Sequence, residues 1–166
     1  SWLSGEHSVP MTAVSIPFPG APAYDPANKP GLATFVSSLM DEGAGDLTSE
    51  AFKQALEARA SRIGAPADRE YLTISMTTLK ENADEAFRLL GLVLTRPRFE
   101  SEAVERMRVA LLSSLKQEDE QPSSVASKSW FATYFGTHPY AHSDSGTTSG
   151  VQSITIDDIK RFAPDH

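Results

Sequence analysis

Three hydroxyl side chains share one side of a segment whose apolar residues predict an α-helix. Thr34, Ser37 and Ser38 are spaced so that a helix would project them from the same face. Two histidines and a glutamate in this arrangement, H-x-x-E-H, hold a zinc ion and activate a water molecule. Serine and threonine hydroxyls stay protonated near neutral pH and are not usual zinc donors. The segment has the spacing of a metal site without its ligands.

The same serines could act as nucleophiles if a histidine base lay beside them. Catalytic serines of known classes occur in patterns such as G-x-S-x-G or S-x-x-K. Neither pattern surrounds Ser37 or Ser38. The sequence favours a helix surface that is solvated or faces an internal chamber.

Two histidines and an acidic run are further candidate ligands. His138 and His142 are four residues apart, which on a helix would place both on one face. Pro139 lies between them and favours a loop, so we expect structural or surface roles for both. The run 118–120 could attract a cation, but three consecutive residues point in different directions on a helix. A solvated helix end is the favoured interpretation.

Four aromatic residues recur at helical spacing near the end of the chain: Trp130, Phe131, Tyr134 and Phe135. They could form a platform for a peptide or a base. Aromatic residues at helical spacing more commonly pack in a core, so we expect these to be buried.

The hydroxyl residues need a helix that is anchored on its other side. Pro30 suits a first helical turn and Gly43 suits a C-terminal cap, so we predict a helix over residues 30–41. Its apolar residues recur at i, i+3, i+4, i+7 and i+8, a stripe that can press into a core. They are Leu32, Phe35, Val36, Leu39 and Met40.

The remaining elements follow from apolar periodicity and from turn and cap residues. In chain order we predict a strand over 11–18, a loop over 19–28, a helix capped by Thr48, a hairpin of 61–67 with 71–77, a helix between Glu81 and Arg96, a helix over 102–119, another from Ser123 or Ser124 to Gly136, and a short helix from a capping box at Thr155 to Phe162. This order predicts an α+β fold, a mostly antiparallel (mixed) β-sheet with helices packed on one face.

Composition narrows the class of protein further. The 166 residues fit a single domain, 1–166, and the net charge of −7 argues against nucleic acid or an anionic membrane as partner. No apolar run approaches the ~20 residues needed to span a bilayer.

The absence of cysteine excludes disulfides, thiolate zinc sites and a cysteine nucleophile. It leaves both a periplasmic and a cytoplasmic location in a bacterium open. Because Ser1 replaces an initiator methionine, we interpret the chain as an excised or processed piece.

Residues 29–52 contain a glycine, a hydrophobic helix, a second glycine and a new helix start. This stretch resembles the insulinase, pitrilysin and mitochondrial-processing-peptidase family of zinc peptidases. Other stretches resemble the same family in register, and together they cover nearly the whole chain: 11–18, 78–79 with 82–94, 96–99, 136–140, 146–147 and 154–162.

The resemblance assigns family roles to four positions. The two zinc histidines fall on Thr34 and Ser38, the water-activating glutamate falls on Ser37, and the third zinc ligand falls on or beside Ser114. All four are hydroxyl residues here, so the resemblance implies no metal, no cofactor and no catalytic residue. Residues 41–45, Asp-Glu-Gly-Ala-Gly, look like the corresponding turn of bacterial non-catalytic members.

The resemblance also implies how such a chain works. It would be the N-terminal domain of a longer two-domain subunit, which pairs with an active zinc-bearing partner subunit in a hetero-oligomer. Four such domains enclose a chamber that holds a peptide substrate. Two alternatives stay open. One is a scaffold or assembly protein of the same fold that handles no peptide, and the other is an enzyme with a different metal site at His138 and His142.

Overall fold

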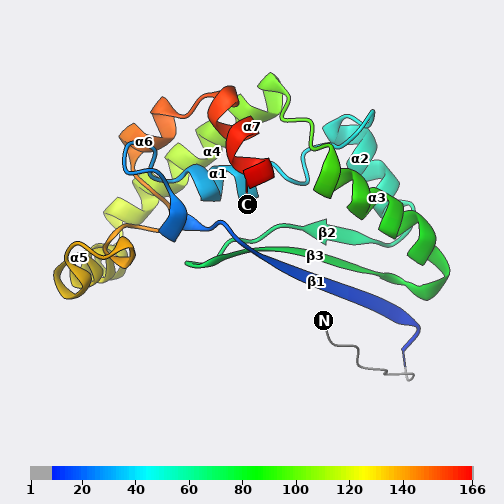
Figure 1. The fold of residues 1–166 in the computed structure, drawn as a ribbon, viewed down its shortest axis with the longest axis horizontal. Helices are drawn as coiled ribbons and strands as arrows, with labels where there is room; N and C mark the ends of the chain where they lie inside the picture. The colour runs from blue at the N-terminus through cyan, green and yellow to red at the C-terminus, as the bar shows by residue number, and fades with distance from the viewer. Residues whose placement is uncertain (1–8, 166) are drawn as a thin grey trace.

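The structure is a computed structural model that describes residues 9–165. Helices cover one face of a small sheet whose strands run in the order β1-β3-β2 (Figure 1). The strands are β1 (Met11–Pro19), β2 (Arg62–Gly64) and β3 (Tyr71–Leu79). The helices are α1 (Leu32–Ser37), α2 (Ser49–Glu57), α3 (Ala83–Thr95), α4 (Ser101–Glu120), α5 (Pro122–Phe135), α6 (Thr148–Ser153) and α7 (Ile156–Asp165), with 3-10 turns η1 (Pro22–Tyr24), η2 (Lys80–Asn82) and η3 (Pro139–Ala141).

The sheet is antiparallel at every strand pairing within residues 9–165. Its inward face carries alternate apolar residues, so Ile16 of β1 lies opposite Ile74 of β3, and Phe18 lies opposite Leu72. Burial of these residues against the helices fixes the register, because a slip by one residue would turn them to solvent. The predicted α+β fold, with helices on one face of the sheet, is confirmed.

The core lies between the sheet and α1, α3, α4 and α7. Phe35 and Leu39 are completely buried, as are Leu89 of α3 and Val104 of α4. Aliphatic and aromatic side chains from elements far apart in sequence therefore meet around α1. No helix among residues 9–165 is long and apolar enough to cross a membrane.

The predicted helix over 30–41 is shorter in the structure. The α-helix proper is Leu32–Ser37, and the chain then continues in tighter turns, in which the amide of Leu39 donates to the carbonyl of Val36. Gly31, at φ +98°, occupies the position before the helix. The apolar stripe is buried as predicted, because the tighter turns keep Leu39 and Met40 on the core side.

The two capping predictions are confirmed. The Thr48 hydroxyl accepts from the amide of Ala51 and begins α2, while Thr155 and Asp158 exchange side-chain and backbone hydrogen bonds at the start of α7. The short α6 had no counterpart in the sequence prediction.

Candidate functional site

The N-terminal end of α1 is held by a carboxylate from the preceding loop. Asp25 accepts hydrogen bonds from the amides of Gly31 and Ala33, at 2.6 and 2.8 Å. Burial raises the pKa of Asp25 to about 6, although both hydrogen bonds act in the opposite direction. The loop before α6 closes over this end. A Cβ atom on Gly146 would lie 2.4 Å from the carbonyl oxygen of Pro30, so only glycine allows this approach.

The hydroxyl groups of Thr34 and Ser37 in α1, and of Ser38 at its C-terminal cap, point to backbone carbonyls and not to one another. Thr34 donates to the carbonyl of Asp144 at 2.7 Å, and Ser37 donates to that of Ala65 at 2.6 Å. Ser38 donates to the carbonyl of Phe35 within its own helix, at 2.7 Å. All three side chains are half-buried. They join α1 to two other segments of the chain, so the expected solvated surface is only partly observed.

Ser114 lies on α4 with an exposed side chain. Arg108 of α4 contacts α1, because its guanidinium group lies 5.1 Å from the centre of the Phe35 ring. The same group donates to the carbonyl oxygens of Val151 and Ile154. Arg108 therefore connects α4 with α1 and with the segment of α6.

The four motif residues do not fit a zinc ion. Zinc in proteins is bound by imidazole, thiolate or carboxylate donors. The hydroxyl groups of Thr34, Ser37 and Ser38 are protonated, and each donates a hydrogen bond to a backbone carbonyl. Within the described residues no group of three or more His, Cys, Asp or Glu side chains could hold a metal ion. These four hydroxyl residues therefore do not make a set of zinc donors.

A charged cluster follows α1 that sequence reasoning missed. The buried Glu42 carboxylate accepts from Ser49 and Lys53 of α2 and from Arg106 of α4. Burial favours a higher pKa for Glu42, but the hydrogen bonds from Lys53 and Ser49 and the charges of Lys53 and Arg106 lower it overall. The acidic Glu42 before Gly43 was the only local signal, since its partners lie up to 64 positions away.

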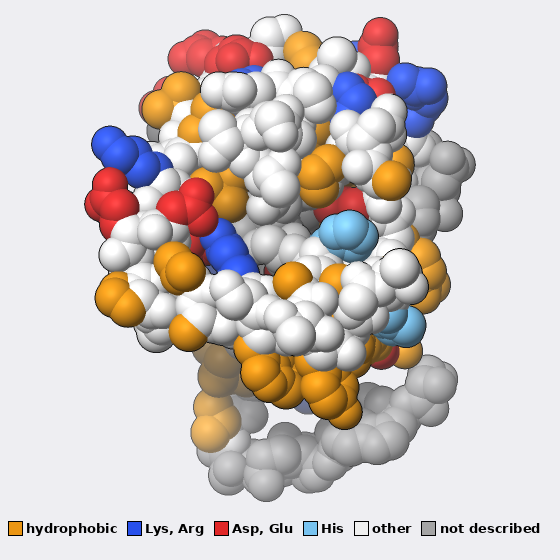
Figure 2. All heavy atoms as spheres, turned by 90° about the vertical axis from the view of Figure 1, so that its left-hand side faces the viewer, with side chains coloured by type: hydrophobic (Ala, Val, Ile, Leu, Met, Phe, Trp, Pro, Cys, Tyr) orange, Lys and Arg blue, Asp and Glu red, His pale blue; other side chains and the backbone are white. Residues whose placement is uncertain are grey.

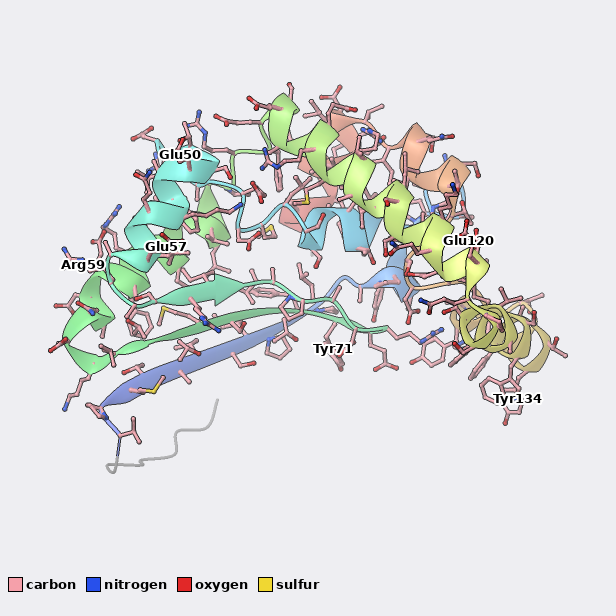
Figure 3. The ribbon with its side chains drawn as sticks, turned by 180° about the vertical axis from the view of Figure 1, so that it is seen from behind. Glu50, Glu57, Arg59, Tyr71, Glu120 and Tyr134 are labelled. Carbon is pink, nitrogen blue, oxygen red and sulfur yellow. The ribbon has the colours of Figure 1, made fainter. Side chains whose placement is uncertain are left out.

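This cluster borders an open cleft of about 590 Å³ between α2 and α4. Glu50 and Glu57 of α2 stand on its rim, at the opposite end of the molecule from α5 (Figure 3). Both cations of the cleft, Lys53 and Arg106, are already paired with Glu42. The ion pairs of Glu42 at the edge of the cleft therefore link α2 to α4.

The two histidines lie in a loop, as predicted. η3 separates them, His138 accepts from the amide of Tyr140 through Nδ1 at 3.2 Å, and both side chains are exposed. The acidic run ends α4. Glu118 and Asp119 pair with Lys128 of α5, at 3.2 and 2.9 Å, and Glu120 is exposed.

The prediction that the four aromatic residues are buried was wrong. Trp130 and Tyr134 are 55% and 70% exposed, and α5 has no buried residue. Figure 1 shows the reason, because α5 lies beyond the end of the sheet, where no described element covers its outer side. The aromatic rings pack on one another instead, with Trp130 stacked on Tyr134 at 5.1 Å.

These features define a class of protein. They describe an α+β domain in which an antiparallel sheet is covered on one face by helices, and Thr34, Ser37 and Ser38 lie at the spacing of an H-x-x-E-H motif along a segment packed in the core. The chain belongs to the insulinase family, peptidase family M16, whose sequence profile matches residues 6–148.

Three comparisons give more detail. The chain is 30% identical, over 93% of its length, to the non-peptidase homolog YmxG of Helicobacter pylori, and 25% identical, over 82%, to a probable mitochondrial-processing peptidase subunit beta of Arabidopsis thaliana. It spans 36% and 26% of those proteins. The crystal structure of a peptidase M16 inactive domain from Pseudomonas fluorescens superposes with a TM-score of 0.90 at 24% identity, covering 95% of this chain and 39% of the other.

The similarity to a protein named a non-peptidase homologue, and the absence of imidazole and carboxylate side chains at Thr34, Ser37 and Ser38, support a non-catalytic domain of the family. The structural likeness, at 24% identity, establishes the fold.

Proposed function

We propose that the chain is the N-terminal domain of a longer, non-catalytic subunit that pairs with an active, zinc-bearing partner subunit. The pair encloses a chamber for peptide substrates, in which the partner supplies the chemistry and this chain supplies wall and binding surface. Residues 1–166 form one of the domains of that chamber.

One observation supports the proposal: α1 lies in the core, and hydroxyl groups bonded to backbone carbonyls stand where the family resemblance would place metal ligands. Phe35 is completely buried, and Thr34 and Ser37 are bonded to segments 110 and 28 positions away. Catalytic or metal-binding side chains would be oriented toward a shared reaction centre. These are used to fix the helix, as expected of a domain that is retained as a structural partner.

The test is reconstitution of the complex. The full-length protein is co-expressed with an M16 chain that carries an intact H-x-x-E-H motif, and the two are purified alone and together. We expect a one-to-one complex, cleavage of unstructured peptides only in the mixture, and zinc only in the partner. Replacing the glutamate of the partner's motif by glutamine should abolish cleavage, whereas Ser37→Ala in this chain should not.

Two results would contradict the proposal. Stoichiometric, tightly bound zinc in the isolated chain would refute the loss of the metal site. A stable complex whose partner cleaves peptides equally well without this chain would favour the alternative role as a scaffold.

A further inference from the structure

The most unusual surface of the molecule is the outer face of α5. We use this name for five exposed residues at helical spacing: Ser123, Ala126, Trp130, Thr133 and Tyr134. Hydrophobic side chains gather over α5 at the lower edge of the end view in Figure 2. Aromatic residues in an uncharged patch are typical of the centre of a protein interface.

The outer face is held firmly. Phe131, on the inner side of α5, stacks on Phe135 at 5.6 Å and lies 4.1 Å below the guanidinium group of Arg69. Arg69 also donates to the carbonyl of Tyr140 and to the carboxylate of Asp144. These contacts tie α5 to the hairpin and to the loop after it, so its exposed side is presented by a fixed helix.

The charge on α5 permits contact between identical chains. The whole chain carries a net charge of −7, so most surfaces of two copies would repel each other. The single charged residue of α5 is Lys128, and it is paired with Glu118 and Asp119 at the end of α4. The outer face itself has no charge, and two copies can meet there without like charges opposing each other.

The sizes of the side chains along the outer face suit pairing with a second copy. Its first half carries the small Ser123 and Ala126, and its second half carries the large Trp130 and Tyr134. If two copies meet about a two-fold axis with antiparallel helices, the large half of each lies on the small half of the other. The helix dipoles then also oppose each other, which is the favourable arrangement.

The area suits a weak dimer. Trp130 and Tyr134, at 55% and 70% exposure, offer roughly 250 Å² per copy, and the whole face offers roughly 500 Å². Two copies would bury about 1,000 Å² in total, which lies at the lower limit for a specific interface. We propose that the outer face of α5 binds the same face of a second copy, giving a homodimer that is separate from the pairing with an active subunit.

The test is sedimentation velocity of the full-length protein over the micromolar range. We expect a reversible monomer–dimer equilibrium. Trp130→Ser should raise the dissociation constant at least tenfold by removing the large residue, as hot-spot aromatic residues do. Ala126→Trp should have a similar effect by filling the small half. Both positions are exposed in the monomer, so neither change should lower the melting temperature at a concentration where the wild-type protein is monomeric. Val109→Ser, at an exposed apolar residue of α4, is the control and should leave dimerisation unchanged.

Three results would overturn the proposal. They are a protein that is monomeric throughout the range, a dimer that is insensitive to both α5 variants, and a monomer in which Trp130 is already protected from hydroxyl-radical labelling. The last result would show that the face is covered by another part of the same chain. None of them bears on whether the active partner cleaves peptides in the mixture, so the two proposals fail separately.

Discussion

The motif helix α1 and the aromatic helix α5 use opposite kinds of side chain for opposite purposes. α1 carries hydroxyl groups at the spacing of an H-x-x-E-H motif, and it lies in the core with Thr34 and Ser37 bonded to carbonyls of other segments. α5 is rich in aromatic residues, and it buries none of its 14 residues. Integration into a fold therefore depends on what the neighbouring segments cover and not on how apolar a helix is.

The two helices also differ in what their side chains contribute to, which is folding stability for α1 and the proposed intermolecular contact for α5. The hydroxyl groups of Thr34 and Ser37 donate hydrogen bonds to backbone carbonyls of distant segments, so they matter for stability. The exposed rings of Trp130 and Tyr134 on α5 contribute little to the folded core, and in the proposed dimer they contact a second copy. Matched substitutions in the two helices test this difference.

The largest contrast is expected between Phe35→Ala and Tyr134→Ala. Removing the buried ring of α1 leaves a cavity and should lower the free energy of unfolding by about 3–5 kcal/mol. Removing the exposed ring of α5 should change it by less than about 0.5 kcal/mol. Urea titration followed by circular dichroism, at a concentration where the protein is monomeric, measures both. Equal losses would show that α5 is part of the folding core.

The second-largest difference in the free energy of unfolding is expected between a substitution at Glu42, the buried carboxylate after α1, and one beside α5. Glu42→Gln removes the charge that Lys53 and Arg106 neutralise, at an expected cost of about 2–3 kcal/mol. Lys128→Met, which breaks the ion pairs beside α5, should cost no more than about 1 kcal/mol. Because the folded-state pKa of Glu42 is lowered from 4.5, its contribution is present above that pH and is lost as the pH falls through the folded-state pKa. If Glu42→Gln lost unfolding free energy on acidification as steeply as the wild type does, this assignment would be contradicted.

A pH effect of opposite sign is expected at the start of α1. Burial raises the pKa of Asp25 from 3.8 to about 6, so the folded state binds more protons than the unfolded state between these values. Its contribution is fully present below pH 3.8 and is lost as the pH rises through about 6. The slope can reach about 1.4 kcal/mol per pH unit.

Asp25→Asn should remove that slope, and thermal unfolding at a series of pH values measures it. Asp119→Asn, at an exposed residue beside α5, is the matched control and should keep the wild-type profile. If the two variants behave alike, Asp25 does not titrate in this range.

The smallest contrast is between two hydroxyl groups. Ser37→Ala leaves the carbonyl of Ala65 without its donor and should cost about 1 kcal/mol. Thr133→Ala removes a hydroxyl that bonds only within the exposed α5, and it should cost less than about 0.5 kcal/mol. Neither change should alter peptide cleavage by the reconstituted complex by more than about twofold, since no proton transfer is assigned to either group. A large loss of cleavage with Ser37→Ala alone would return that serine to the list of catalytic candidates.

Local signals in the sequence predicted most of the architecture. The alternation in β1 and β3, the Thr48 and Thr155 caps and the apolar stripe of α1 depend on residues close together in the chain, and the structure contains them all. The short α6 was missed, although Thr147 caps it by accepting from the amide of Gly150.

What could not be predicted depends on distant segments. The spacing of Trp130 and Tyr134 is the same whether a helix is covered or bare, and coverage is decided by where the other elements end. The Glu42 cluster and the bond from Thr34 to Asp144 join positions that only the folded chain brings together. The candidate site was therefore located by its spacing, whereas its bonding required the structure.

The hydrogen bond from Thr34 to Asp144 also affects the protein during synthesis. α1 emerges from the ribosome before its partner carbonyl, which lies 110 positions later, and the Asp158 that pairs with Lys29 at 2.9 Å comes later still. An emerging chain cannot complete this part of the core until almost every described residue has been translated. Until then the apolar stripe of α1 is an exposed sequence of the kind that chaperones bind and proteases cut.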